Sequence, residues 1–165
     1  MRLIRVLAAV VVACALTGSA VAAGGSNAVV KVRSTSLGKI LVGANGKTLY
    51  LFALDKGTKS KCSGQCATFW PPLITTGAAK AGAGVAMTML GTTRRSDGKL
   101  QVTYHGHPLY FFAEDKKAGQ VKGEGFTGFG AKWWAVSPAG NKVAPAGGTT
   151  TTPTTTSGGG GGGYG

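Results

Sequence analysis

Apolar and polar residues alternate along several short stretches of the chain, and this two-residue period is typical of β-strands with one buried face. The first stretches are 29–35, 40–42 and 48–52. The last two flank Asn45-Gly46, and Asn-Gly is the strongest short signal for a hairpin turn. The pattern therefore predicts a three-stranded meander.

The same pattern returns later in the chain, at 85–90, 100–104 and 109–112. Turn residues at 96–99 and 105–107 separate these stretches. We therefore expect a second three-stranded meander here. Elsewhere no long helical period is visible, and the exception that we expect is one short helix at about residues 63–69, which Pro71 ends.

The two meanders are copies of one sequence unit. Residues 38–56 and 98–116 align without a gap, and ten of the 19 positions are identical. Neither copy alone has enough strands to be stable, so we expect an all-β fold in which two pseudo-symmetric repeats pack as a small sandwich or barrel-like domain. The aromatic residues expected to form the shared layer are Tyr50, Phe52, Trp70, Tyr110, Phe112, Trp133 and Trp134.

The first 23 residues are typical of a signal peptide that is removed on export. A basic start, an apolar run at 3–16 and small residues at 20–22 supply its three parts. The run is shorter than the roughly 20 apolar residues of a transmembrane helix. Cys14 lies in a context that loosely matches the bacterial lipidation pattern, so lipid attachment there is the alternative to plain secretion.

Composition divides the remaining chain into a domain and a tail. Residues 24–35 are a lead-in strand, and 36–144 form the two-repeat β domain, with repeat 1 at about 28–80 and repeat 2 at about 84–144. Residues 145–165 are rich in Thr, Pro and Gly, and we expect this tail to be disordered because it has too little apolar surface to bury.

One six-residue motif occurs in both copies, as Tyr50-Leu-Phe-Ala-Leu-Asp55 and Tyr110-Phe-Phe-Ala-Glu-Asp115. With these motifs the chain resembles, over roughly residues 36–141, the bacterial "secreted repeat of unknown function", a family of predicted lipoproteins marked by Tyr-x-aromatic-x-x-Asp. The resemblance implies an extracytoplasmic, envelope-associated protein and no established activity. The motif residues that it singles out are Tyr50, Phe52, Asp55, Tyr110, Phe112 and Asp115.

The chain is strongly basic, with 18 Lys and Arg residues against five Asp and Glu residues and a net charge of +13. Removal of residues 1–23 takes away Arg2 and Arg5 and leaves +11. Outside the cytoplasm, such a protein attracts anionic polymers or anionic lipid surfaces. The lysines are scattered, so we expect no specific nucleic-acid site, and we expect a monomer; solubility alone is the other reading of the charge.

Two cysteines remain after export, Cys62 and Cys66, and an even pair in an exported chain predicts a disulfide. The loop that it closes is very short, so its stabilisation is roughly 2 kcal/mol at most. A redox-active pair is the alternative.

His105 and His107 are the only histidines, and their i, i+2 spacing puts both on one face of a strand. Met87 and Met89 have the same spacing on a neighbouring predicted strand. Imidazole and thioether groups suit copper, so an extracytoplasmic copper or redox protein is our alternative function. In the competing interpretation His105 is a turn residue and the methionines are partly core.

Asp55 and Asp115 occupy the same place in the two copies. If they converge they could do acid–base work, whereas at separate strand ends they would accept backbone hydrogen bonds. No phosphate loop, zinc signature or nucleophile–base motif is visible, so we predict no catalytic residues and a binding or structural module.

Trp133 and Trp134 are adjacent, so in a strand their side chains point to opposite faces. One of the two rings is then directed toward solvent and is our candidate for a ligand contact; a second packed layer is the alternative.

Overall fold

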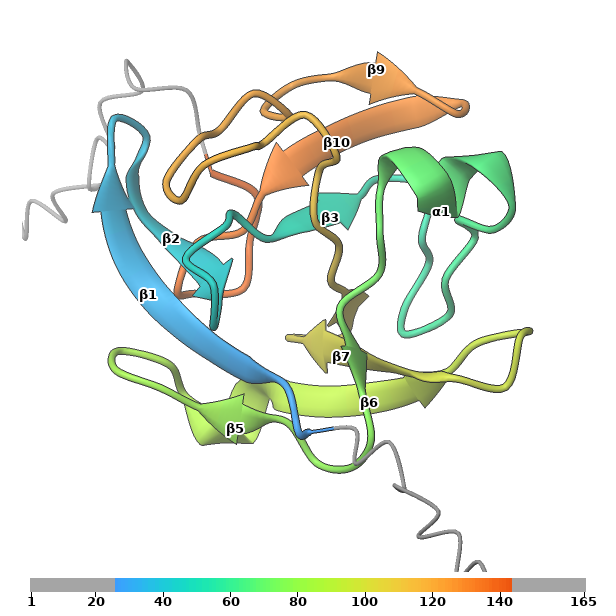
Figure 1. Cartoon of the computed structure of the whole chain (residues 1–165), viewed down its shortest axis with the longest axis horizontal. Coiled ribbons are helices and arrows are strands. Elements are labelled where there is room, and N and C mark those ends of the chain that lie inside the picture. Colours follow the sequence, from blue (N-terminus) through green and yellow to red (C-terminus); the bar gives the residue numbers. More distant parts are fainter. Residues whose placement is uncertain (1–25, 144–165) are drawn as a thin grey trace, which may run out of the picture.

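The computed structural model describes residues 26–143, which form an all-β fold with one short helix (Figure 1). The predicted signal peptide with Cys14 and the predicted tail lie outside the described residues. The elements are β1 (Val29–Thr35), β2 (Gly38–Gly43), β3 (Tyr50–Phe52), α1 (Gln65–Phe69), β4 (Ile74–Thr75), β5 (Lys80–Ala81), a 3-10 turn η1 (Met87–Met89), β6 (Leu90–Arg94), β7 (Leu100–Tyr104), β8 (His107–Pro108), β9 (Thr127–Gly128) and β10 (Ala131–Ala135).

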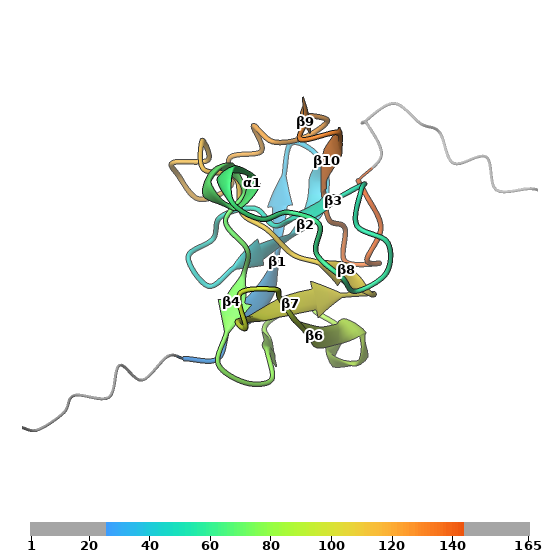
Figure 2. The same cartoon turned by 90° about the vertical axis from the view of Figure 1, so that its right-hand side faces the viewer.

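Three small open sheets make up the fold. Their strand orders are β2-β1-β5, β3-β10-β9 and β4-β7-β6, and β8 also pairs with β7. The β6–β7 layer lies at one end of the molecule and the β9–β10 hairpin at the other (Figures 1 and 2). The expected two-repeat β fold is confirmed in its sandwich-like form, and α1 confirms the short helix near the cysteine pair.

In each repeat, two residues that are hydrogen-bonded to each other are bridged by a third residue from the other repeat. The first triad is Leu41, Leu49 and Val136, and the second is Val102, Leu109 and Leu73. The N–H to C=O distances around the first triad are 2.8, 3.0 and 3.1 Å, and those around the second are 2.9, 3.0 and 2.9 Å. Each repeat thus completes the backbone pairing of the other, so the core is shared.

These triads show that the gap-free alignment of the repeats is one residue out of register in β2 and β7. It pairs Leu41 with Gln101, whereas the residue with equivalent hydrogen bonds is Val102. The connecting turns differ in length. In the second repeat, Thr103 pairs with Pro108, and residues 104–107 lie between them. In the first repeat, Val42 pairs with Thr48, and the longer link 43–47 lies between them. Gln101 therefore corresponds to Ile40 in the structure, and it is fully buried.

The expected strand at 85–90 is wrong. Met87–Met89 forms the turn η1, and the strand begins only at Leu90. In the β6–β7 hairpin, Arg94 pairs with Leu100 next to the connecting loop. At the other end of the hairpin, Leu90 pairs with Tyr104, which is the last residue of β7. Residues before Leu90 therefore have no β7 partner to extend the ladder.

The expected third strand at 109–112 is also absent as a regular strand. Tyr110 makes single bridges to Tyr50 and to Pro72 instead. In the first copy, β3 is three residues long and pairs with β10 of the second copy. The meanders are therefore incomplete, because their third members join the two repeats.

Stacked aromatic rings fill the space between the repeats. Trp70 and Trp133 stack at 3.9 Å between ring centroids and an interplanar angle of 3°. Phe112 of the second repeat covers Trp70 at 4.3 Å, and Phe52 of the first covers Trp133 at 4.0 Å. The expected shared layer thus forms, but Trp134 does not join it, since that ring packs partly buried against the second core cluster.

Candidate functional site

The two repeats exchange hydrogen bonds through the tyrosine and aspartate of their common motif. The Tyr50 hydroxyl donates to Asp115 Oδ2 and the Tyr110 hydroxyl donates to Asp55 Oδ2, both at 2.7 Å. The tyrosines also pair through their backbones, at 2.8 and 3.0 Å. These reciprocal bonds tie each repeat to the other.

The aspartates also close the loops that follow them. Asp55 Oδ1 accepts from the Lys61 N–H at 2.7 Å, and Asp115 Oδ1 accepts from the Lys122 N–H at 3.0 Å. Burial raises the pKa of both carboxyl groups, although the hydrogen bonds oppose this effect. Among the described residues no hydrogen bond joins the two carboxyl groups, and each of them anchors the loop that follows it.

The surroundings of Asp55 contain a buried arginine that the sequence did not single out. Arg95 donates to Gln101 Oε1 at 2.7 Å, to Ser60 Oγ at 2.9 Å and to the Cys62 carbonyl at 2.7 Å. The predicted disulfide between Cys62 and Cys66 is confirmed. It shapes the loop that offers its carbonyl to Arg95, a structural role. No signal in the sequence distinguishes Arg95 from its exposed neighbour Arg94, because only the fold buries one of them.

The histidines do not share a strand face, so that premise of the copper hypothesis is wrong. His105 has a φ of 49° and forms a turn with Gly106, while His107 lies in β8. Met87 is 59% exposed on η1, and Met89 packs against the core. Between residues 26 and 143 no group of three or more His, Cys, Asp or Glu side chains is placed to hold a metal ion.

The adjacent tryptophans differ in exposure. Trp133 is fully buried, and its Nε1 donates to the Gly128 carbonyl at 3.2 Å. Trp134 is half-buried, and the Nζ atoms of Lys132 and Lys142 lie 5.4 and 5.0 Å from its ring centroid. Two lysines therefore already contact the ring that we expected to contact a ligand.

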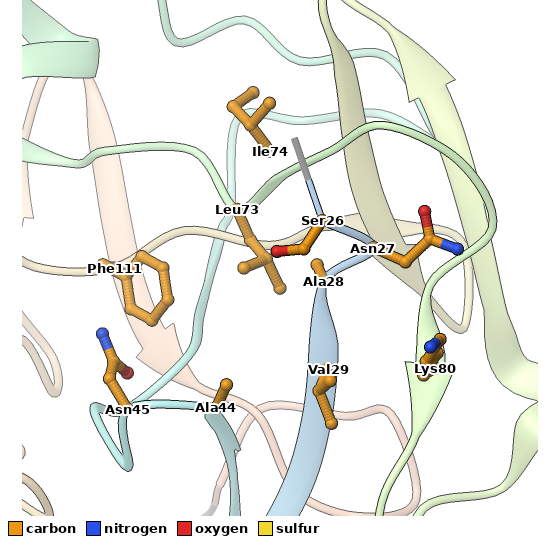
Figure 3. Close-up of a pocket in the computed structure, with 10 residues that line it drawn as sticks. All are labelled: Ser26, Asn27, Ala28, Val29, Ala44, Asn45, Leu73, Ile74, Lys80 and Phe111. Carbon is orange, nitrogen blue, oxygen red and sulfur yellow. The ribbon is translucent and has the colours of Figure 1, made fainter. Parts of the chain in front are cut away.

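A hollow of about 460 Å³ lies beside the start of β1 (Figure 3). Leu73 and Phe111 contribute apolar walls, and Asn27, Asn45 and Lys80 contribute polar groups. Figure 3 shows these side chains arriving from separate segments around one space. Such a combination of an aromatic ring, amides and one cation suits a polar ligand with a negative charge.

Local structure explains how these side chains come together. Lys80 is held beside Val29 by the parallel pairing of β5 with β1. The Phe111 ring lies against Gly43, where a Cβ atom would come within 2.8 Å of it. Asn45 Oδ1 accepts from the Lys47 N–H at 3.0 Å, which leaves the Nδ2 group for another partner. The sequence could not indicate this hollow, because its lining comes from five separate segments of the chain.

Charge is separated between the interior and the surface. Asp55 and Asp115 are buried, and Glu124 is half-buried with its carboxylate accepting from the Ala135 N–H at 2.7 Å. The two exposed acids, Asp97 and Glu114, lie 3.7 and 3.5 Å from basic groups. All the lysines and arginines of residues 26–143 are exposed except half-buried Lys47 and buried Arg95. The charged groups exposed on the surface are therefore almost all cationic.

Comparisons with known proteins define a family and no activity. A family model described as a secreted repeat of unknown function matches residues 31–74 and 91–137. No curated protein and no solved structure shows significant similarity to the chain. Within residues 26–143, no helix is long and apolar enough to cross a membrane.

Proposed function

The chain belongs to the family of secreted repeats of unknown function, and from this premise we propose that it is an extracytoplasmic module that binds an anionic polymer of the cell envelope. The observation that carries the proposal is the separation of charge. Buried or paired acids leave the exposed lysines and arginines without nearby compensation, so the positive field extends into solvent.

The hollow beside β1 is the place where one unit of the polymer enters. Lys80 supplies the positive charge, the Asn45 amide donates hydrogen bonds, and Phe111 offers a ring against which a sugar can pack. The surrounding lysines then hold the flanking units by long-range attraction. In this proposal the Tyr-x-aromatic-x-x-Asp motif serves the scaffold, because its side chains tie the repeats together.

A salt series with matched charge reversals tests this function. Lys80→Glu changes the hollow, whereas Lys99→Glu makes the same charge change at the exposed β6–β7 turn. We expect isolated envelope polymer and soluble polygalacturonate to bind the parent protein and to be released by salt. Lys80→Glu should weaken binding about tenfold more than Lys99→Glu, since an interaction of about 1.4 kcal/mol is lost at the site.

Two results would contradict the proposal in different ways. Absent or salt-insensitive binding would remove the polymer function altogether. Equal losses in the two variants would leave a general cationic surface and remove the hollow as the binding site.

A further inference from the structure

Three exposed phenylalanines gather at the end of the molecule opposite the start of β1. Phe69 at the end of α1, Phe126 before β9 and Phe129 in the β9–β10 turn are 45%, 42% and 40% exposed. The Phe69 and Phe129 ring centroids lie 5.9 Å apart. Figures 1 and 2 both place α1 and the β9–β10 hairpin together at this end. We call these three side chains the phenylalanine tip.

The backbone holds Phe129 in a conformation that is unfavourable for its side chain. Gly128 pairs with Ala131, so Phe129 and Gly130 form a two-residue turn, with φ values of 56° and 92°. Positive φ at both positions defines the type I′ turn, which favours Asn-Gly. A bulky aromatic residue is rare in this region. The turn therefore carries an exposed phenyl ring at a position where asparagine would be relaxed.

The phenylalanine tip rests on the aromatic core and is not a loose loop. The Phe126 ring centroid is 5.8 Å from that of Trp70 and 5.5 Å from that of Phe112. The same ring lies across Gly128, where a Cβ atom would come within 2.6 Å of it. The core thus presents the exposed rings on a preformed support, which lowers the entropic cost of binding through them.

The chemistry of this surface fits a lipid bilayer better than a polysaccharide. In the hollow, Asn45 and Lys80 accompany the Phe111 ring and can meet the polar groups of a sugar. The phenylalanine tip consists of phenyl rings, whose transfer from water to an apolar phase is favourable. Leu54, which is 41% exposed, follows Ala53, whose N–H donates to the Lys132 carbonyl at the base of the hairpin. The β9–β10 hairpin carries the exposed Lys132, and the chain as a whole is strongly positive, which complements anionic head groups.

We propose that the phenylalanine tip docks the protein on anionic lipid bilayers, with Phe129 entering the boundary between head groups and acyl chains. The exposed lysines attract the anionic head groups, and the apolar rings then hold the protein at the surface. The start of β1, whose residues line the hollow, lies toward the other end of the molecule (Figure 1), so an envelope polymer and a bilayer can be bound together.

Phe129→Asn separates a role in membrane binding from a role in folding, because it should weaken vesicle binding and raise thermal stability. The exported protein, with Cys14→Ser in every variant so that an attached lipid cannot contribute, is co-sedimented with vesicles of phosphatidylglycerol and phosphatidylcholine. We expect partitioning into these vesicles to fall about tenfold, since a phenyl ring no longer leaves water. The midpoint of thermal unfolding should rise by a few degrees, because Asn-Gly relaxes the turn.

His105→Asn is the matched control. His105-Gly106 is a second two-residue turn with positive φ at both positions, 49° and 80°, and it lies away from the phenylalanine tip. This substitution should raise the unfolding midpoint in the same way and leave vesicle partitioning unchanged. Phe129→Trp adds a direct readout, since fluorescence from the tip should be quenched by brominated lipids.

Several results would overturn the inference. One is no binding of the parent protein to phosphatidylglycerol vesicles, and another is equal partitioning of Phe129→Asn and the parent. Unquenched fluorescence in Phe129→Trp would show that the tip stays in water. If Phe129→Asn lost polygalacturonate binding and kept vesicle binding, the phenylalanine tip would be a sugar-binding surface instead.

Discussion

At the scale of single residues, the two tyrosine–aspartate pairs explain why the motif occurs once in each repeat. Each hydroxyl–carboxyl hydrogen bond, 2.7 Å long, connects a tyrosine of one repeat to the aspartate of the other. Burial raises the pKa of Tyr50 and of Tyr110, so both hydroxyls remain protonated donors. The aspartates in turn anchor the loops that begin with Lys56 and Lys116.

The raised pKa values of these aspartates predict an unusual dependence of stability on pH. The unfolded carboxyl titrates near 3.8, and burial raises the pKa of Asp55 and of Asp115 above that value. The folded state therefore binds more protons between the two values. The stabilisation from these groups is complete below pH 3.8 and is lost as the pH rises through the folded pKa.

His107 has the opposite effect on the pH dependence of stability, so it must be replaced before the contribution of the aspartates can be measured. Burial lowers the pKa of His107 from 6.5, so its contribution is lost as the pH falls below that value. In His107→Gln we expect the thermal midpoint to rise by a few degrees from pH 7 to pH 4. Asp55→Asn with Asp115→Asn should make the rise shallower, though Glu124, whose pKa burial also raises, keeps it from vanishing. A midpoint that falls on acidification in His107→Gln would contradict this account.

At the scale of elements, the strands are predictable but their partners are not. The hydrophobic alternation correctly located β1, β2 and β7, since each has a local two-residue period. The alternation predicted a strand at 85–90 from Val85, Met87 and Met89, and this was wrong. Leu90 already pairs with the last residue of β7, so the residues before it have no partner in that strand. Likewise, β3 pairs with β10, a choice that no local pattern contains.

The shared triads predict that neither repeat folds alone. Without Val136 the first repeat loses the bridge between Leu41 and Leu49, and without Leu73 the second loses its equivalent. Each half would also expose one side of the Trp70–Trp133 stack. We expect fragments 26–83 and 84–143 to show little β-structure separately by circular dichroism and to regain it when mixed. Cooperative unfolding of either fragment alone would show that the repeats are independent.

At the scale of the whole molecule, we expect the positive charge to attract anionic ligands and also to destabilise the folded state. The chain without residues 1–23 has a net charge of +11, so its lysines and arginines repel one another. Few exposed acids are available to offset this repulsion. Salt shortens the range of this repulsion to about 8 Å at physiological ionic strength.

The same salt series should therefore move stability and binding in opposite directions. From 10 to 300 mM sodium chloride we expect the thermal midpoint to rise by a few degrees while polymer affinity falls. Sodium sulfate at matched ionic strength separates screening from surface exclusion, because sulfate also strengthens burial. A midpoint that stays constant in sodium chloride would mean that the lysines are spaced widely enough not to interact.

The sequence by itself determined the repeat, the β class, the disulfide and the net charge, because each is written in local spacing or in composition. The tertiary structure decided which groups meet. It gave each aspartate the tyrosine of the other repeat, buried Arg95 and left Arg94 exposed, shifted β7 by one residue and gathered the phenylalanine tip. Such choices depend on contacts between residues that are dozens of positions apart, and side-chain burial follows from strand register, which only the completed packing sets.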